Sequence, residues 1–565
     1  MIVPMKHLDL LCVAGDKENT LKALRELGAV HLDLASAQGA EVTEEKGLAA
    51  DAEKAVRLIQ KYRKELPEGL SASKPFEGPL PGGVLELADT VDALKSQADQ
   101  LEREIKKYAP YGDFDPALAQ KLIDLGIDVA SVAELPEKLP AKRLSAMESD
   151  LASLRAEIAA KGAQIASADE QSILALYPQL ADRVAFAAAK ELISEQGAIA
   201  CIAGWVPAPA VESLRQAVSR NGWGVLLRDP VDGELPPTLV EPPKLFRPMQ
   251  ALFAGLGIAP AYTEADVSVP FMCYFSLFFA MLVGDGAYGA IFLAATLFGW
   301  WKTRPKGEAG HRPRAVLSWL TLLTVFSSAT VVWGVLSNTW FGAGIPWCRD
   351  WPTVRWLADP SYNNMMLLCF TIGVSHLMLA RLWNGVCKWP DSTALAEFGW
   401  AGILLTMYLV TNTIVKIFPA FPAWGYWVGG ISIALVFLFT VKPSELKAHG
   451  AELGMLPLSI MSALGDVISY VRLFAVGLAS VKVAENFNMM ALDVARVGHV
   501  WWTSALLAVG MVVILLVGHG LNLAMAGLSI LVHAVRLNTL EFSNHKGVSW
   551  SGHAFRPFRR ESVSP

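Results

Sequence analysis

Two apolar stretches near the C-terminal end decide the fold: SALGDVISYVRLFAVGLASVKVAENF at 462–487 and GHGLNLAMAGLSILVHAVRLNTLEF at 518–542. Each is long enough for a membrane helix, and each carries one arginine, Arg472 or Arg536, among Val, Leu, Ile and Phe. A guanidinium at bilayer depth costs roughly 2.5–3.5 kcal/mol even on insertion scales, so it needs a partner or a task. Both arginines are therefore functional candidates.

The helical faces around the two arginines differ in character. On a 3.6-residue period, small residues share the face of Arg472, and such a face lets another helix pass close to the backbone. Polar residues instead form a stripe before Arg536, interrupted only by Ala526. The small face comprises Gly465, Ser469, Ala475 and Ala479, and the polar stripe comprises His519, Asn522, Ser529 and His533.

The composition indicates two unlike halves. The 565 residues are 53% hydrophobic yet 18% charged, and the charged residues gather in 1–247 whereas the long apolar runs lie in 267–544. The net charge of -5 gives no indication of nucleic-acid binding. The six cysteines form no CxxC pair, which argues against a zinc site or a disulfide framework. We therefore expect no metal and no cofactor.

Motifs of enzymatic chemistry are missing from the sequence. No GxxxxGK[ST] phosphate loop, HExxH motif or nucleophile elbow occurs. A GxGxxG string at Gly284, Gly286 and Gly289 lies inside an apolar run without βαβ context, so it is not read as a dinucleotide site. We therefore expect no catalytic chemistry from the chain by itself.

The first half predicts a soluble arm of class α+β at 1–247. Strand–helix–strand patterns at 5–34 and 198–228 suggest two small α/β lobes, near 1–80 and 170–235. Two heptad-spaced stripes favour an antiparallel helical hairpin near 84–166; ordinary amphipathic helices packed on a lobe are the alternative. The stripes are Val91, Leu94, Ala98, Leu101, Ile105 and Tyr108, and Leu144, Met147, Leu151, Leu154 and Ile158.

The second half predicts an all-α transmembrane bundle at 267–544, after a linker at 248–266 and before a cytoplasmic tail at 545–565. The expected eight spans lie near 267–283, 286–301, 315–337, 363–384, 397–418, 423–441, 454–492 and 499–543. The last two are long and must tilt or protrude, because roughly 39 residues at about 1.5 Å rise give roughly 58 Å.

An even number of spans returns the C-terminus to the side of the N-terminus. Basic loops at 302–314 and 442–453 assign that side to the cytoplasm, and four tryptophans in 338–361 suit the outer interface. Asp9 interrupts the first apolar run, which argues against a cleaved signal peptide. We expect a multi-pass protein of a prokaryotic plasma membrane, with both termini cytoplasmic.

This topology places polar residues on opposite sides of the arginines. Ser462 and Asp466 lie on the cytoplasmic side of Arg472, with Ser469 beside it, whereas the polar stripe lies on the outer side of Arg536. Two such half-paths suit rotary translocation, in which an ion enters from one side onto a carboxylate of a moving ring and leaves from the other. The fixed guanidinium charge ionises that carboxylate, which releases H⁺ or Na⁺, and blocks direct leakage.

The two arginine-bearing stretches resemble the membrane stator of rotary V-type and A-type ATPases, called subunit a or subunit I. Three further stretches share this resemblance: IAGWVP at 202–207, PPTLVEPPKLFRPMQALF at 236–253 and PFMCYFSLFFAMLVGDGAYG at 270–289. The resemblance implies that Arg472 is the essential arginine and Arg536 the supporting one. It also implies that the bundle faces a proteolipid ring (c, K or L type) within the lipid membrane. The arm would bind peripheral-stalk E/G heterodimers and the central-stalk cap subunit (C or d).

The sequence departs from the family pattern at two positions. Many members carry a glutamate where this chain has Ala526, and a histidine where it has Ser480. Glu485 is the candidate replacement for the outer carboxylate, with Lys482 as its salt-bridge partner.

Each arginine also has a purely structural alternative, and the function has an alternative as well. Arg472 would otherwise form a structural ion pair with Asp466 or Glu485, and Arg536 one with Glu541. The alternative function is a secondary transporter or channel with a cytoplasmic regulatory domain. Such transporters usually have repeated halves, and no internal repeat is visible.

Overall fold

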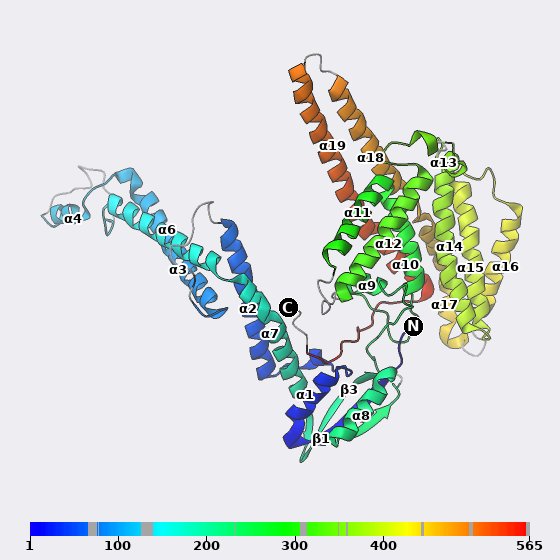
Figure 1. Ribbon diagram of the computed structural model, residues 1–565, viewed down its shortest axis with the longest axis horizontal. Coiled ribbons are helices and arrows are strands. Elements are labelled where there is room, and N and C mark those ends of the chain that lie inside the picture. The colour runs from blue at the N-terminus through cyan, green and yellow to red at the C-terminus, as the bar shows by residue number, and fades with distance from the viewer. Residues whose placement is uncertain are drawn as a thin grey trace. The chain divides into compact units, whose positions relative to one another are not determined.

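The computed structural model describes residues 1–65, 76, 78–125, 139–231, 233–304, 314–348, 350–357, 360–441, 446–496 and 501–560. Part of each predicted basic loop (305–313 and 442–445) lies outside the described residues. The chain divides into two compact units (Figure 1). We call Met5–Val231 with Arg556–Pro565 the arm, and Met1–Pro4 with Asp232–Phe555 the membrane unit.

The arm contains one antiparallel sheet with strand order β2-β3-β1-β4. The strands are β1 (Met5–Val13), β2 (Ser194–Gln196), β3 (Ile199–Pro207) and β4 (Gly224–Arg228). The patterns at 5–34 and 198–228 were expected to form two lobes, but they share this sheet, because β1 pairs along its whole length with β3. Helices α1 (Lys17–Leu27) and α8 (Val211–Asn221) each follow a strand and end at a glycine with positive φ, Gly28 or Gly222.

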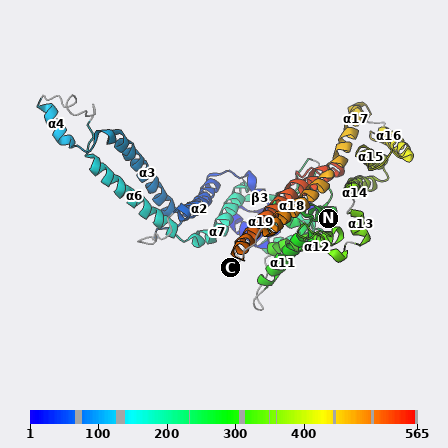
Figure 2. The same cartoon turned by 90° about the horizontal axis from the view of Figure 1, so that it is seen from above.

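Long helices extend the arm away from the sheet. They are α2 (Ala40–Glu65), α3 (Gly82–Tyr108), α6 (Leu144–Ser167) and α7 (Glu170–Glu191), with α4 (Pro116–Asp124) beyond them. Helices α3 and α6 lie side by side in both views (Figures 1 and 2). They run antiparallel, because Val84 shares a cluster with Ile165 while Glu102 pairs with Arg155 at 3.0 Å. Val91, Ala98, Met147 and Leu151 of the heptad stripes are buried.

Of the expected tail at 545–565, the part that begins at Arg556 belongs to the arm, whereas 545–555 belong to the membrane unit. Phe558 is 4% exposed and packs in the core cluster of the sheet lobe. Its backbone N–H donates to the Val30 carbonyl at 2.7 Å, and the Arg556 N–H donates to His31 Nδ1 at 3.0 Å. Both ends of the membrane unit therefore connect to the same compact body.

The membrane unit is helical. Its first helices are α9 (Met249–Leu256), α10 (Ser268–Val283), α11 (Gly286–Lys302), α12 (Arg314–Ser337) and α13 (Pro352–Leu357). Helices α14 (Asn363–Lys388), α15 (Thr393–Ile414) and α16 (Ala423–Phe439) follow. The core brings together Phe271, Phe275 and Phe278 of α10 with side chains of α12, α14 and α18.

Five helices among the described residues are long and apolar enough to cross a membrane, whereas eight spans were expected. They cover Val316–Ser337, Asn363–Lys388, Thr393–Ile414, Gly454–Val494 and Leu507–Lys546. The other three expected spans correspond to α10, α11 and α16, which have 16, 17 and 17 residues. At about 1.5 Å per residue they reach roughly 24–26 Å, less than a typical hydrocarbon core. The count of eight stays a prediction.

The two arginine-bearing segments are not uniform α-helices. Helix α17 (Leu446–Ile468) ends just before Ser469 and Tyr470, and α18 (Val471–Arg496) begins directly after them. Helix α19 (Trp501–Ser529) continues into two π-helical segments, η6 (Ile530–Ala534) and η7 (Leu537–Phe542), and then into α20 (Ser543–Lys546). Helices α18 and α19 pack along each other (Figures 1 and 2).

Candidate functional site

The two arginines meet at one carboxylate. Glu541 Oε1 lies 3.6 Å from Arg472 Nη1 and 3.3 Å from Arg536 Nε. The Glu541 side chain is 5% exposed, whereas those of Arg472 and Arg536 are 24% and 52% exposed. Arg472 therefore has neither Asp466 nor Glu485 as its ion-pair partner within the described residues, while the pairing of Arg536 with Glu541 is present. We call Arg472, Arg536 and Glu541 the arginine cluster.

Local backbone irregularity positions this cluster. Ser469 and Tyr470 interrupt the helix, and the Arg472 N–H then bonds the Ser469 carbonyl in an i→i−3 pattern at 3.3 Å. The Arg472 Nη2 also donates to the Ser469 hydroxyl at 3.0 Å, which holds the guanidinium end of the side chain. Arg536 lies between η6 and η7. Such π segments often occur at functional sites.

Within the part of the chain that the structure describes, the small-residue face beside Arg472 is largely exposed. Gly465, Ala475 and Ala479 are exposed, and Ser469 is half-buried. A Cβ atom built on Gly465 would meet nothing within 4 Å. The face is therefore free to receive another helix at close approach.

A polar network joins α11, α18 and α19, and we call it the Tyr288 cluster. The Tyr288 hydroxyl accepts from Asn522 Nδ2 at 3.1 Å and lies 2.7 Å from His519 Nδ1. His519 Nε2 lies 3.1 Å from Asn488 Oδ1. Asn522 Nδ2 also donates to the Ser480 carbonyl at 2.9 Å, and the Ser480 hydroxyl donates to Asn522 Oδ1 at 3.1 Å. Of these five residues, the sequence predicted only His519 and Asn522 as lining a half-path. The structure adds Tyr288, Ser480 and Asn488.

The hydrogen bonds of this cluster have one consistent direction. Tyr288 accepts from Asn522, so its hydroxyl proton is available to His519 Nδ1. His519 then carries its own proton on Nε2 and donates to Asn488 Oδ1, because the Asn488 amide nitrogen donates to the Phe341 carbonyl. The result is an ordered chain of donors and acceptors.

A second polar network involves α14, α15, α17 and α20, and we call it the His545 cluster. Asp466 Oδ2 lies 3.0 Å from His545 Nε2, and Arg381 Nε donates to His545 Nδ1 at 3.1 Å. Arg381 also bonds Glu397 at 3.0 Å, and Lys388 bonds the other Glu397 oxygen at 2.6 Å. Sequence analysis proposed Asp466 alone. Arg381 and Glu397 lie in expected spans, so the rule that flagged the two arginines also applies to them.

The remaining candidates are more dispersed. Ser462 is exposed and Ser529 half-buried. The Nδ1 of His533 is buried and has no hydrogen-bond partner among the described residues, and the ring lies within electrostatic reach of both arginines. Glu485 pairs with Lys482 at 2.7 Å as expected, but the structure does not bring it into the arginine cluster.

The glycine string at 284–289 serves packing. Gly284 caps α10 with φ 69°, and Gly286 and Gly289 of α11 touch the backbone of α12 so closely that a Cβ atom would clash. Asp285 is fully buried and accepts from the backbone N–H groups of Ala287 and Gly342, at 2.8 Å each. It caps the N-terminus of α11 and binds the backbone at Gly342.

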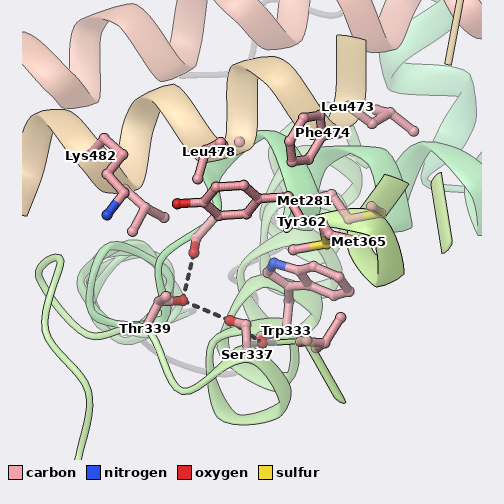
Figure 3. A pocket seen from close by; sticks show the side chains of 14 residues that line it. Met281, Trp333, Ser337, Thr339, Tyr362, Met365, Leu473, Phe474, Leu478 and Lys482 are labelled. Carbon is pink, nitrogen blue, oxygen red and sulfur yellow. Dashed lines mark hydrogen bonds between the residues drawn. The ribbon is translucent and has the colours of Figure 1, made fainter. Parts of the chain in front are cut away.

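A cavity of about 200 Å³ lies beside α18. Figure 3 shows Tyr362 and Trp333 among its lining side chains, with Lys482 at one end. Its lining is largely apolar: Met281, Trp333, Tyr362, Leu473, Leu478 and Lys482 contribute. It contains no residue of the arginine, Tyr288 or His545 clusters, so it is a separate feature.

Comparison with known proteins identifies relatives with one common name. No family model matches the chain. V-type ATP synthase subunit I of Borreliella burgdorferi is 32% identical over 64% of this chain and 60% of its own length. V-type ATP synthase subunit I 1 of Treponema pallidum is 29% identical over 99% of this chain and 100% of its own. A-type ATP synthase subunit I of Methanocaldococcus jannaschii is 25% identical over 75% and 64%, respectively.

The fold and the site together define a helical membrane protein with an α+β arm, in which two arginines of the membrane unit converge on one buried carboxylate. The resemblance seen in the sequence is confirmed, and the chain is a homologue of V-type and A-type ATP synthase subunit I, with one relative aligned over nearly its whole length.

Proposed function

We propose that this chain is the membrane stator of a rotary V/A-type ATPase. It provides two offset half-channels, and its arginines take the ion from the carboxylate of a rotor ring. This couples ion movement to rotation and so to ATP hydrolysis or synthesis in other subunits. One observation carries the proposal: two arginines of membrane helices converge beside an uncovered small-residue face.

The chemistry follows from a fixed charge next to a mobile one. Arg472 stays protonated, and its side chain is 24% exposed, so its guanidinium can face an incoming carboxylate. An opposite charge within about 4–6 Å favours the ionised form of a carboxyl group. A ring carboxylate that arrives beside Arg472 therefore gives up its H⁺ or Na⁺ there. The same positive charge blocks direct passage of a cation between the two sides.

The two polar clusters supply the half-channels in this proposal. The ordered hydrogen bonds of the Tyr288 cluster suit proton transfer on the outer side, and the His545 cluster contributes carboxylates on the cytoplasmic side. Ser462, Ser469, Ser529 and His533 extend these paths. Glu485, paired with Lys482 outside both clusters, stays a candidate for the outer entrance.

The tail supports an orientation with both termini on the same side. Phe558 packs in the core of the arm, so the C-terminal end returns to the body that holds the N-terminal strands. Such a return requires an even number of membrane crossings. With the basic loops assigned to the cytoplasm, the arm and both termini lie there.

Partners follow from the uncovered surfaces. Helix α19 and η6 present a row of exposed apolar side chains: Val509, Val512, Leu516, Leu521, Leu528 and Leu531. Lipid and the proteolipid ring would cover them, as such a surface in a membrane requires. The long helices of the arm suit the peripheral-stalk E/G heterodimers, and its sheet lobe suits the central-stalk cap subunit.

The decisive experiment replaces Arg472→Ala in the assembled complex and measures ATP hydrolysis and ion transport separately in proteoliposomes. We expect a complex that assembles and hydrolyses ATP but transports no ion. Arg355→Ala is the matched control, because Arg355 pairs with Asp350 at 2.9 Å yet is exposed. Retained transport in Arg472→Ala would refute the mechanism. Ion flux through the subunit alone, without ATPase partners, would favour a channel or secondary transporter.

A further inference from the structure

One carboxylate contacts two guanidinium groups in the arginine cluster. Glu541 Oε1 contacts both Arg472 and Arg536, at 3.6 and 3.3 Å. Glu541 Oε2 is buried and has no hydrogen-bond partner among the described residues, and neither has the buried Arg472 Nη1. The cluster therefore keeps a net positive charge and unused hydrogen-bonding capacity.

The π-helical backbone makes this arrangement possible. Arg536 and Glu541 are five residues apart, and a regular α-helix would place them about 140° apart around its axis. The i→i+5 hydrogen bonding of a π-helix brings residues five apart to the same side. Segment η7 (Leu537–Phe542) has this conformation directly after Arg536. The irregular turn thus turns Glu541 back to the arginines.

The other charged or titratable groups near Glu541 are held elsewhere. Asp466 of α17 interacts with it electrostatically but is bonded to His545, and the Tyr470 hydroxyl is bonded to His376. His533 is within electrostatic reach of both arginines. Glu541 is therefore the carboxylate that directly offsets the charge of Arg472 and Arg536.

We propose that Glu541 is a positioning residue that sets how strongly the arginines hold the ring carboxylate; this rests on the proposed function. When a ring carboxylate arrives, two carboxylates share two guanidinium groups, so Arg472 engages the ring and Arg536 keeps Glu541. When the ion binds and the ring carboxylate becomes neutral, Arg472 returns to Glu541. Glu541 thus helps Arg472 to release each ring carboxylate as the ring turns.

The test is the ion dependence of ATP-driven transport by the complete complex with Glu541→Gln. Loss of one negative charge at about 10 Å, with an effective dielectric constant of about 20, shifts a carboxyl midpoint by about one pH unit. The ring carboxylate then stays ionised to lower pH. We expect the concentration of the transported ion at half-maximal rate to rise about tenfold, which for H⁺ moves the alkaline limb of the pH profile down by about one unit.

The control is Asp350→Asn, the same carboxylate-to-amide change at an arginine partner that is 84% exposed. It should leave the half-saturating ion concentration unchanged. A purely structural role of Glu541 would lower the maximal rate without moving that concentration, and this result would overturn the proposal. If the amide variant fails to assemble, Glu541→Asp replaces it, because the shorter carboxylate offsets the arginines less. It should shift the same midpoint in the same direction by a smaller amount, and an unshifted midpoint would again overturn the proposal.

The two proposals fail in different ways. Transport by Arg472→Ala would refute the stator mechanism itself. If Arg472→Ala stops transport while Glu541→Gln keeps the wild-type ion dependence, the stator mechanism stands and the role of Glu541 alone is rejected.

Discussion

Substitution Gly373→Ala is predicted to disturb the arginine cluster from a distant helix. Gly373 of α14 faces the ring of the fully buried Tyr470, which lies in the helix interruption two residues before Arg472. An alanine Cβ would lie 2.6 and 2.8 Å from the two Cδ atoms of that ring, and closer to its Cγ. Carbon atoms normally stay about 3.5–4.0 Å apart, so the ring must withdraw by about 1 Å.

The structure sets the size of the effect. Overpacking of this kind costs about 1–3 kcal/mol, and loss of the Tyr470 hydroxyl contact with His376 Nδ1, now 2.9 Å, adds about 1 kcal/mol. Alanine regains about 1 kcal/mol of helix propensity, so the free energy of unfolding falls by about 1–3 kcal/mol. Arg472 moves with Tyr470. A misplacement of about 1 Å at a reacting group can cost about a hundredfold in rate, so transport should fall more than stability suggests.

The assay compares thermal unfolding, ATP hydrolysis and ion transport of the purified complex. Gly430→Ala in α16 is the control, because its Cβ would meet nothing within 4 Å; it should be neutral or slightly stabilising. In a Tyr470→Leu background, Gly373→Ala should cost less than in the wild type, since the clashing ring is gone. Wild-type stability and transport of Gly373→Ala would refute the claim that Tyr470 is held rigidly beside Arg472.

Two further predictions test the face beside Arg472 and the tail. Gly465→Leu should leave the stability of the subunit unchanged but reduce transport, because the leucine side chain enters the open face that the ring would occupy. Unchanged transport would show that the ring does not occupy this face. Gly430→Leu is the control. Phe558→Ala should destabilise the arm by about 3–5 kcal/mol and speed hydrogen exchange in β1 and β3, with no change in α14 or α15. Uniform exchange across both units would contradict a tail that belongs to the arm core.

The sequence was informative where a single helix carries the signal. The small-residue face of Arg472 and the Lys482–Glu485 pair follow from neighbours a few residues apart, and the structure contains both. Periodicity cannot, however, predict which strand a distant strand pairs with. This is why two strand–helix–strand patterns suggested two lobes, whereas β1 and β3 lie in one sheet.

The polar clusters were harder to predict because they join several helices. Tyr288 was quoted only within the stretch at 270–289, yet its hydroxyl connects His519 and Asn522. The ring of His376 stacks on that of Phe542, with the two centroids 4.4 Å apart, and its Nδ1 also bonds the hydroxyl of the distant Tyr470. A polar residue within an apolar stretch indicates that its polar group needs a hydrogen-bond partner. Only the packing of the helices shows which partner it has.

The sequence suggested the pairing of Arg536 with Glu541, and the structure contains it, but the contact of the same carboxylate with Arg472 was not predicted. The sequence analysis assumed a regular 3.6-residue period, which places Arg536 and Glu541 on different sides of their helix. It also assumed that 454–492 form one continuous helix. Both assumptions fail near the arginines, because Ser469 and Tyr470 interrupt one helix and η6 and η7 widen the other. Irregular backbone at membrane depth is tolerated where protein surrounds it and satisfies its polar groups. Two irregular segments that meet at one buried carboxylate are therefore expected to be maintained by function, since regular helices would have met the demands of packing alone.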